Sequence, residues 1–409
     1  MPSVCFYFQV HQPRRVKRYR VFDVGHDHEY FNDSGEGKTN NKKIIEKVSG
    51  KSYLPMNATL LEMIKKNPEF RCTFSLSGIF IEQLEEYAPE TLASFQKLVA
   101  TGNVEILGET YYHSLSALYN EDEFKEQVKL HSKKIKDVFG TKPKVFRNTE
   151  LIWSDSLANT VLSLGFEGVL AEGADRILEW RSPNFLYEAP RSRDNRESLV
   201  LLLKNYRLSD DIAFRFGEKG WIEWPLTVEK FTDWVNAVND NGDVVNLFMD
   251  YETFGEHQWE STGIFEFMKA LPKAILANKD NSFVTASQSI NKFPVRGELS
   301  FPDWVSWADV ERDLTAWRGN SIQDDALARL YKIREKVLAT KDKKLIEDWR
   351  RLTTSDHFYY MCTKWFADGD VHKYFNPYES PYDAYIAFTN VLNDLEGRTN
   401  VGKRLKVKG

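Results

Sequence analysis

The sequence predicts an α/β protein in which parallel strands alternate with helices. Seven short apolar runs read as strands, and helical patterns lie between most of them. Polar and ionisable residues directly follow several of these runs, as they do where parallel strands end at one rim. After about residue 290 convincing strands stop and long helical stretches take over. We therefore expect an α/β domain at residues 1–290 and a helical domain at residues 291–409.

The expected strands are the best-defined elements of the first domain. The clearest is the last, because Val244, Val245, Leu247, Phe248 and Met249 are apolar, which is typical of a strand buried on both faces. Pro13 ends the first strand, since proline has no backbone N–H to donate. The seven strands are expected at 4–10, 70–76, 104–107, 144–147, 167–170, 199–203 and 244–249.

Helical spacing predicts the connections and the second domain. Leu60, Leu61 and Ile64 lie on one side of a helix at 53–67, and Asn120 with Glu123 forms a plausible capping box for a helix at 121–139. Residues 14–51 are polar, basic and too long for an ordinary connection, so we expect a lid or a partly ordered excursion. Beyond 290 the helical stretches are 309–323, 324–340 and 344–366.

Composition excludes several classes of function. The 55 basic and 60 acidic residues give a net charge of −5, so nothing draws the whole molecule to nucleic acid or an anionic membrane. No run approaches about eighteen apolar residues and the opening MPSVCFYFQV lacks a leader pattern, which predicts a soluble cytoplasmic chain. Cys5, Cys72 and Cys362 are far apart, so we expect no disulfide framework. Aromatic residues make up 14% of the chain, and such side chains fill cores or stack on sugar rings.

The ends of the expected strands supply a set of acids and histidines. These are His11, Glu109 with His113, Glu150, and Asp250 with Glu252. Glycoside hydrolysis typically requires two carboxylates that converge from different strands. One acts on the sugar carbon, and the other exchanges a proton with the bridging oxygen. A separation of about 5–5.5 Å permits direct attack and retention, whereas roughly 6.5–9.5 Å admits a water and gives inversion.

Five segments together resemble the conserved sequence regions of glycoside hydrolase family 57, in order and spacing. Residues 206–216 (YRLSDDIAFRF) add a similarity to the α-amylase branch of that family. The resemblance runs from Val4 to about Gln323. The five segments are HQP at 11–13, GNVEILG at 102–108, FRNTELIW at 146–153, DYETFGEHQW at 250–259 and DVERDLTAWRGNSIQ at 309–323.

This resemblance implies a fold, an activity and roles for individual residues. The implied fold is an incomplete (β/α)7 barrel followed by a C-terminal helical bundle that packs on the barrel and closes the site. The implied activity is retaining hydrolysis of α-1,4-glucans such as maltodextrin, glycogen or starch, with no cofactor and no metal. By motif position Glu150 matches the nucleophile and Asp250 the general acid/base. His11, Glu105 and Glu252 match residues that shape the adjacent sugar subsite, and Asp313 and Trp317 lie in the helical region.

Several other candidate site residues could have a structural role instead of a functional one. His113 and His257 lie in expected rim loops, where a substrate contact and a packing role are both open. Trp259 is a candidate sugar platform, although most tryptophans belong to packing. Glu105 lies inside a strand and is equally well explained as a buried structural acid. The third region reads Asn148-Thr149-Glu150-Leu151 where the family often has proline and cysteine, which leaves the subtype open.

Three other activities fit parts of the pattern. A 4-α-glucanotransferase or branching enzyme would use the same catalytic pair. A metal-dependent hydrolase could use His11, His113, Asp250 and His257 as ligands, although no close histidine or cysteine pair marks such a site on a strand. A non-catalytic glucan-binding protein would keep the fold without the chemistry. The sequence carries no signal for an oligomeric state.

Overall fold

A computed structural model describes residues 2–33, 37–191, 197–364 and 371–406. The chain divides into two compact units, each assembled from separate segments. Unit 1 comprises residues 1–11, 45–110 and 128–307, and unit 2 comprises 12–44, 111–127 and 308–409. The expected domain boundary at 290/291 therefore falls inside unit 1, which continues to Trp307.

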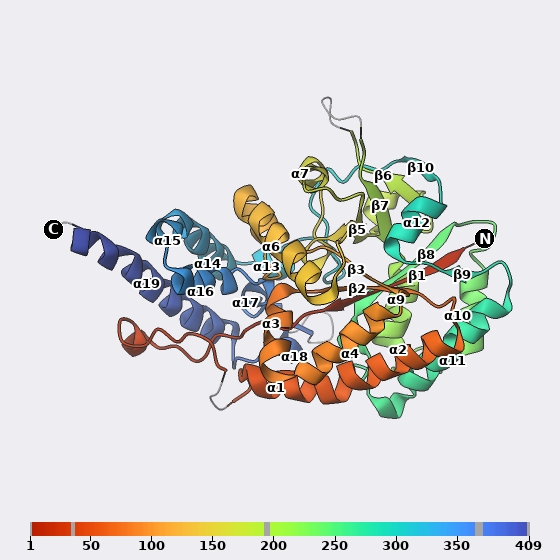
Figure 1. Cartoon of the computed structure of the whole chain (residues 1–409), viewed down its shortest axis with the longest axis horizontal. Coiled ribbons are helices and arrows are strands. Elements are labelled where there is room, and N and C mark those ends of the chain that lie inside the picture. The colour runs from red at the N-terminus through yellow and green to blue at the C-terminus, as the bar shows by residue number, and fades with distance from the viewer. Residues whose placement is uncertain (1, 34–36, 192–196, 365–370, 407–409) are drawn as a thin grey trace. The chain divides into compact units, whose positions relative to one another are not determined.

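All seven expected strands are present in unit 1, in two sheets (Figure 1). In the first sheet the order is β3-β2-β1-β8, with the short β9 also paired to β1, and every pairing is parallel. The register sets Gln9 beside Asp250, so the carboxyl ends of β1 and β8 lie at one level. The strands are β1 (Ser3–Val10), β2 (Cys72–Leu76), β3 (Val104–Ile106), β8 (Val244–Asp250) and β9 (Ser282–Phe283).

The second sheet has the order β10-β6-β7-β5-β4. Its pairings are parallel except for β6 with β7, which is antiparallel. The strands are β4 (Val145–Arg147), β5 (Gly168–Glu172), β6 (Leu186–Glu188), β7 (Val200–Lys204) and β10 (Val295–Glu298). The alternating, mainly parallel arrangement confirms the predicted α/β class.

Backbone contacts join the two sheets at both edges. A parallel bridge pairs Gly108, just after β3, with Phe146 of β4. At the other edge the backbone N–H of Asn205, just after β7, donates to the carbonyl of Asn246 in β8 at 2.9 Å, and the Asn246 amide donates to the Leu203 carbonyl at 2.9 Å. The parallel strands β1, β2, β3, β4, β5, β7 and β8 therefore follow one another through ladders, a bridge or hydrogen bonds.

Helices cover the first sheet because their apolar faces need a partner. Among them α10, α11, α2, α4 and α3 contact one another in that order. The helices up to residue 307 are α1 (Asn41–Val48), α2 (Leu54–Lys66), α3 (Gly78–Tyr87), α4 (Pro89–Ala100), α5 (Ser116–Tyr119), α6 (Glu121–Phe139), α7 (Ala158–Ser163), α8 (Asp175–Leu178), α9 (Tyr206–Asp210), α10 (Val228–Asn236), α11 (Ile264–Ala277) and α12 (Ala286–Lys292).

Single helical turns make many of the loops. They are η1 (Val21–Asp23), η2 (Ser49–Tyr53), η3 (Thr149–Leu151), η4 (Asp155–Leu157), η5 (Asp211–Arg215), η6 (Tyr251–Thr253) and η7 (Glu260–Thr262). Three of them, η2, η3 and η6, carry or hold candidate site residues.

Residues from both sheets share one buried core in unit 1. Cys5 and Tyr7 of β1 pack in the same cluster as Val145, Leu170 and Leu202 of the second sheet. The start of α12 joins this cluster through Ala286, whose N–H donates to the Thr73 hydroxyl at 3.1 Å. Since β9, which directly precedes α12, pairs with Ser3 and Val4, α12 lies at the amino ends of the strands. The carboxyl ends are thus left to the loops that carry the candidate acids.

Unit 2 is mainly helical among its described residues. Asn120 accepts a hydrogen bond from the Glu123 N–H at 2.8 Å, so the predicted N-cap of α6 is present. Tyr385 of α19 donates to Asp325 of α14 at 2.6 Å. Its C-terminal helices are α13 (Thr315–Arg318), α14 (Ser321–Lys332), α15 (Arg334–Thr340), α16 (Lys343–Arg351), α17 (Ser355–Tyr359), α18 (Val371–Phe375) and α19 (Pro381–Lys406).

Some expected boundaries were wrong. Strands do not stop near residue 290, because β10 lies at Val295–Glu298; all four of its residues are exposed, so it has no apolar alternation to detect. The single helix expected at 309–323 is two helices, α13 and α14, because Asn320 caps a new helix by accepting the Gln323 N–H at 3.0 Å. The basic segment 14–51 contains α1 and two helical turns; residues 34–36 lie outside the described residues.

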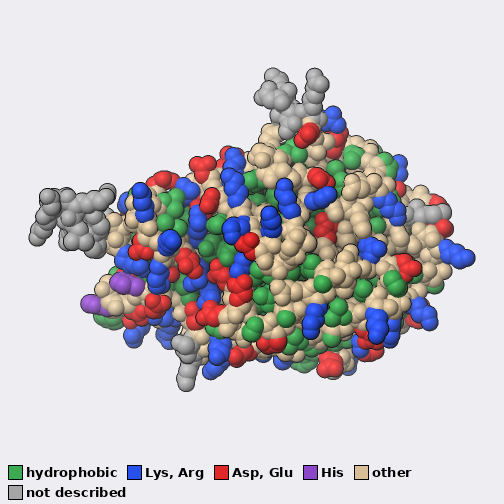
Figure 2. Space-filling view, viewed as in Figure 1, with side chains coloured by type: hydrophobic (Ala, Val, Ile, Leu, Met, Phe, Trp, Pro, Cys, Tyr) green, Lys and Arg blue, Asp and Glu red, His purple; other side chains and the backbone are tan. Residues whose placement is uncertain are grey.

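Charge is distributed as the composition suggests. On the face drawn in Figure 2, basic and acidic side chains are interspersed, so this face shows no large single-sign field. Among the described helices, none combines the length and apolar character that crossing a bilayer requires.

Candidate active site

Asp250 ends strand β8 and begins the loop that the sequence singled out. The next turn, η6, is buried and is anchored to α2 and η2 by side chains. Tyr251 donates to Asn57 of α2 at 2.7 Å, and Tyr53 of η2 donates to the Glu252 carboxylate. Glu252 is therefore a buried acid with a fixed orientation, two residues beyond Asp250.

Glu150 lies in the turn η3, just beyond β4, on a backbone that non-glycine residues rarely adopt. Its φ is 57°, and that of Leu151 is 51°. The surroundings hold this conformation: the Asn148 amide donates to the Ile152 carbonyl at 2.8 Å, and the Thr149 hydroxyl lies 3.0 Å from that of Thr110. Backbone strain of this kind costs about 1–3 kcal/mol per residue and collects at functional sites, where it aims a side chain.

Trp307 fixes the carboxylate of Glu150. Its indole Nε1–H donates to Glu150 Oε2 at 2.7 Å, and its backbone N–H donates to the Glu150 carbonyl at 3.2 Å. The segment is aligned by a short antiparallel pair between Trp153 and Val305, with N–O distances of 2.9 and 3.0 Å. The sequence reasoning missed Trp307; its only signal was a tryptophan-rich stretch, FPDWVSW, at 301–307.

Two cations lie over the ring of Trp307. The guanidinium of Arg147, which is fully buried, is 4.8 Å from the ring centroid, and the Lys204 ammonium is 5.4 Å from it. Lys204 also pairs with Asp210 at 3.0 Å and Glu172 at 3.8 Å. The indole that binds Glu150 is therefore itself held between basic side chains.

Tyr7 of β1 is a buried phenol that is influenced by several charged side chains. Its hydroxyl donates to Gln9 and lies 2.6 Å from the Ser75 hydroxyl, inside the core. Burial raises the pKa of Tyr7; the charge of Arg147 opposes this, while those of Glu109 and Asp250 add to it. The charges of Arg147 and Asp250 thus both act on the same buried phenol.

His131 supports the rim between β2 and β3. Its Nε2 lies 2.9 Å from the Leu76 carbonyl, and its Nδ1 accepts the Glu109 N–H at 3.3 Å. Burial lowers the pKa of His131, although the Glu109 charge opposes the shift, so the neutral ring donates through Nε2 and accepts through Nδ1. The sequence reasoning missed this residue too, although its spacing from Phe124, Val128 and Ile135 put it on the inner face of α6.

Two other predicted substrate contacts in unit 1, His11 and Glu105, lie towards opposite ends of the strands. His11 follows β1, and its Nδ1 lies 2.6 Å from the Ser77 hydroxyl. Glu105 instead accepts the Ser287 N–H of α12 at 2.9 Å, towards the amino ends of the strands, and burial raises its pKa. These contacts fit the structural-acid reading of Glu105, and a direct contact with sugar stays a prediction.

The loop beyond η6 carries two further candidates with different surroundings. The N–H of His257 donates to the Glu252 carbonyl at 3.0 Å, and burial lowers the pKa of His257 to about 4, against the attraction of Glu256. Trp259 is 65% exposed, so its ring is free of the core and available to a ligand.

Three predicted site residues belong to unit 2. His113 is buried, has a φ of 50°, and its carbonyl accepts the Ser355 N–H at 2.9 Å. Asp313 accepts the N–H and hydroxyl of Thr315 at 2.8 and 2.6 Å, which makes a local turn. Trp317 is buried and packs on Tyr359. The role of these three residues in the site stays a prediction.

The alternative of a metal-dependent hydrolase would require a group of metal ligands. Within the described parts of the chain, no three His, Cys, Asp or Glu side chains are grouped so that they could hold a metal ion.

Comparisons with known proteins point to one family. The profile of glycosyl hydrolase family 57 matches residues 5–302. A protein of Methanocaldococcus jannaschii named "Putative alpha-amylase" is 39% identical over 404 residues, which is 96% of this chain and 84% of that protein.

Solved structures share the fold at low sequence identity. The 4-alpha-glucanotransferase of Thermococcus litoralis superimposes with a TM-score of 0.66 and 16% identity, over 87% of this chain and 56% of that one. A branching enzyme of Pyrococcus horikoshii gives a TM-score of 0.66 and 14% identity, over 88% of this chain and 86% of that one.

Proposed function

The chain belongs to glycosyl hydrolase family 57, and from that premise we propose that it cleaves α-1,4-glucans with retention, as an α-amylase. The substrates would be maltodextrin, glycogen or starch. One observation carries the assignment of the chemistry: Asp250 ends β8 and Glu150 follows β4 in the turn η3, where the Trp307 indole donates to its carboxylate.

The proposed reaction has two displacements. In the first, a Glu150 oxygen attacks the anomeric carbon, the glycosidic C–O bond breaks, and Asp250 gives its proton to the leaving oxygen. In the second, Asp250 takes a proton from water, the water oxygen attacks the same carbon, and the ester bond to Glu150 breaks. Trp307 would hold the attacking carboxylate in one orientation, which is the positioning that such a step needs.

The finer fold that we infer is an incomplete (β/α)7 barrel. It is supported by the succession of seven parallel strands, with the Gly108–Phe146 bridge and the Asn205–Asn246 hydrogen bond at the two junctions between sheets. We also infer that the helices beyond residue 308 form a bundle, and that Asp313 and Trp317 contact the substrate.

The first sugar subsite would be shaped by His11 and Glu252. His11 follows β1, which pairs with β8, and Glu252 follows β8 two residues after Asp250. His113 and His257 remain candidates for outer contacts.

Glucan transfer or branching is the second candidate function. It is favoured by the similarity to the glucanotransferase and the branching enzyme named above. Either outcome uses the same ester on Glu150, and the acceptor decides between them: water gives hydrolysis and a sugar hydroxyl gives transfer. Incubation with maltoheptaose, followed by chromatography, separates them. Shorter sugars alone mean hydrolysis, longer sugars mean transfer, and new α-1,6 linkages mean branching.

The nucleophile is tested by Glu150→Gln, which keeps the shape of the side chain but removes its negative charge. We expect kcat on maltoheptaose to fall about a thousandfold or more. The matched control, Glu218→Gln, changes an exposed glutamate in unit 1 and is expected to leave kcat unchanged. Retention is checked by NMR of the first anomer released. A Glu150→Gln enzyme with most of its activity, or release of the β-anomer, would contradict the proposed chemistry.

A further inference from the structure

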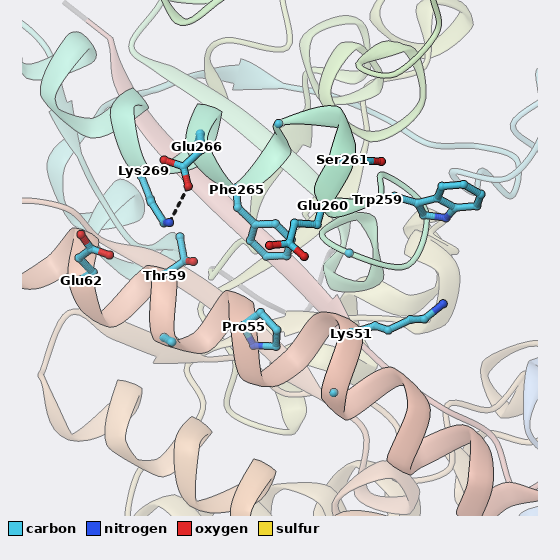
Figure 3. A pocket seen from close by; sticks show the side chains of 14 residues that line it. Lys51, Pro55, Thr59, Glu62, Trp259, Glu260, Ser261, Phe265, Glu266 and Lys269 are labelled. Carbon is cyan, nitrogen blue, oxygen red and sulfur yellow. Dashed lines mark hydrogen bonds and ion pairs between the residues drawn. The ribbon is translucent and has the colours of Figure 1, made fainter.

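A groove of about 860 Å³ lies on the outer side of the loop that carries Asp250 and Glu252 (Figure 3). One wall comes from η2 and α2, and the other from the loop, η7 and α11. Helices α2 and α11, which both supply lining residues, contact each other. None of Glu150, Asp250, His11 and Glu105 lines this groove, so it is distinct from the catalytic pair.

The lining of the groove mixes aromatic surface with hydrogen-bonding groups. Trp259 stands at one end beside Lys51, and Phe265 lies along the floor near Pro55 (Figure 3). Trp259 is 65% exposed, so the face of its ring is accessible to a ligand. Hydroxyls, carboxylates and ammonium groups surround these rings, contributed by Thr59, Ser261, Glu62, Glu260, Glu266, Lys51 and Lys269.

The charges of this lining select the class of ligand. The three glutamates outnumber the two lysines, and Lys269 is already paired with Glu266 at 2.7 Å. A polyanion such as a nucleic acid would meet net negative charge here, and an apolar peptide would leave these charged groups without water. A neutral polyol avoids both costs, because its ring faces stack on aromatic side chains while its hydroxyls hydrogen-bond to the charged groups.

We infer that this groove is a second glucan-binding site, in which Trp259 stacks on a sugar ring of a chain held outside the catalytic site. The inference rests on the proposed function for the identity of the sugar. It assigns Trp259 to the outer groove.

The groove also has a rigid connection to the loop of Asp250. Gly255 has a φ of 104° and packs so closely on η2 that a Cβ there would lie 2.0 Å from the Lys51 carbonyl oxygen. Lys47 donates to Glu256 in the same loop. The loop is therefore packed tightly against η2 at this end of the groove before a ligand binds, and such preorganisation lowers the entropy lost on binding.

Affinity electrophoresis of the full chain, in gels with and without glycogen, tests the inference. Ala58→Trp fills the groove from an exposed position on α2, and Trp259→Ala removes the proposed platform. We expect each to raise the apparent dissociation constant for glycogen about fivefold or more. Trp180→Ala removes another tryptophan, 84% exposed and outside the groove, and is expected to change nothing. Thermal unfolding checks that all three variants fold.

The outcomes separate the groove from the proposed activity, because wild-type turnover of maltoheptaose is measured independently. Normal retardation of both groove variants, with wild-type turnover intact, would overturn the groove and leave the activity standing. Wild-type retardation that both variants lose, without any turnover, would support the groove and overturn the activity. Absence of both retardation and turnover in the wild type would overturn both.

Discussion

At the scale of single residues, the geometry around Glu150 is defined by side chains far away in sequence. Trp307 is 157 positions away and still provides both a side-chain and a backbone hydrogen bond to it. Glu150 adopts a left-handed φ although it is not a glycine, so the surrounding hydrogen bonds must hold this conformation. The residue that the sequence identified as the nucleophile therefore depends on one that it did not identify.

Trp307→Phe tests this dependence. The phenyl ring keeps most of the contact surface towards Arg147 and Lys204 but loses the Nε1–H donor to Glu150. We expect kcat to fall about 10- to 100-fold, somewhat less than the loss of a donor that binds the transition state directly. Steady-state kinetics and thermal unfolding check this. Trp180→Phe is the control, and an unchanged kcat in a folded Trp307→Phe protein would show that the hydrogen bond is dispensable.

His257 makes stability depend on pH. Its folded pKa of about 4 lies below the ordinary value of 6.5, so the folded state prefers the neutral ring. The associated stability is complete above pH 6.5 and is lost as the pH falls from 6.5 towards 4. Between pH 7.5 and 5.0 this linkage amounts to about 2 kcal/mol.

Urea unfolding at the two pH values measures this loss. His257→Gln is expected to lose about 2 kcal/mol less than the wild type on acidification, whereas the exposed control His26→Gln should behave like the wild type. Equal losses in all three proteins would exclude His257 as the source.

At the scale of elements, the sequence located the strands more accurately than the helices beyond them. All seven predicted strands are present because each is a compact apolar run buried in the core. β6, β9 and β10 were missed: β6 has only three residues, β9 has two, and β10 is wholly exposed. The apolar pattern of a sequence reflects burial, so strands that are short or exposed are not detected from it.

The close packing of the Asp250 loop on η2 is itself testable. Gly255→Ala would place a Cβ 2.0 Å from the Lys51 carbonyl oxygen at a φ of 104°, so we expect a loss of about 3 kcal/mol or more in the free energy of unfolding. Gly263→Ala is the matched control: its φ is also positive, at 83°, but no atom lies within 4 Å, so only about 1 kcal/mol is expected. Equal losses would mean that the loop yields to the added methyl group.

At the scale of the whole molecule, the chain builds its two units from interleaved segments. Unit 2 takes residues 12–44 and 111–127 from within the part of the sequence that otherwise forms unit 1. A change in composition near residue 290 detects only the last of these segments. His113 accordingly belongs to unit 2 although it follows a strand of unit 1 by a few residues.

The participation of unit 2 in catalysis is tested by Asp313→Asn. The amide can still accept the hydrogen bonds from Thr315, so the local turn is retained while the negative charge is lost. If Asp313 contacts the substrate, KM for maltoheptaose should rise several-fold, by about 1 kcal/mol or more in binding. Asp324→Asn, at a more exposed acid in unit 2, is the control, and an unchanged KM would restrict Asp313 to the turn.

The sequence by itself determined the α/β class, the seven strands and the family, because buried strands and family motifs each consist of contiguous residues. It also named Glu150 and Asp250 as candidates, from motifs at the ends of β4 and β8. Only the tertiary structure identified Trp307, which binds the Glu150 carboxylate, the buried Arg147, Tyr7 and His131, and the outer groove that Trp259 lines. These contacts join residues tens to hundreds of positions apart, and their free energy exists only once folding has brought the segments together.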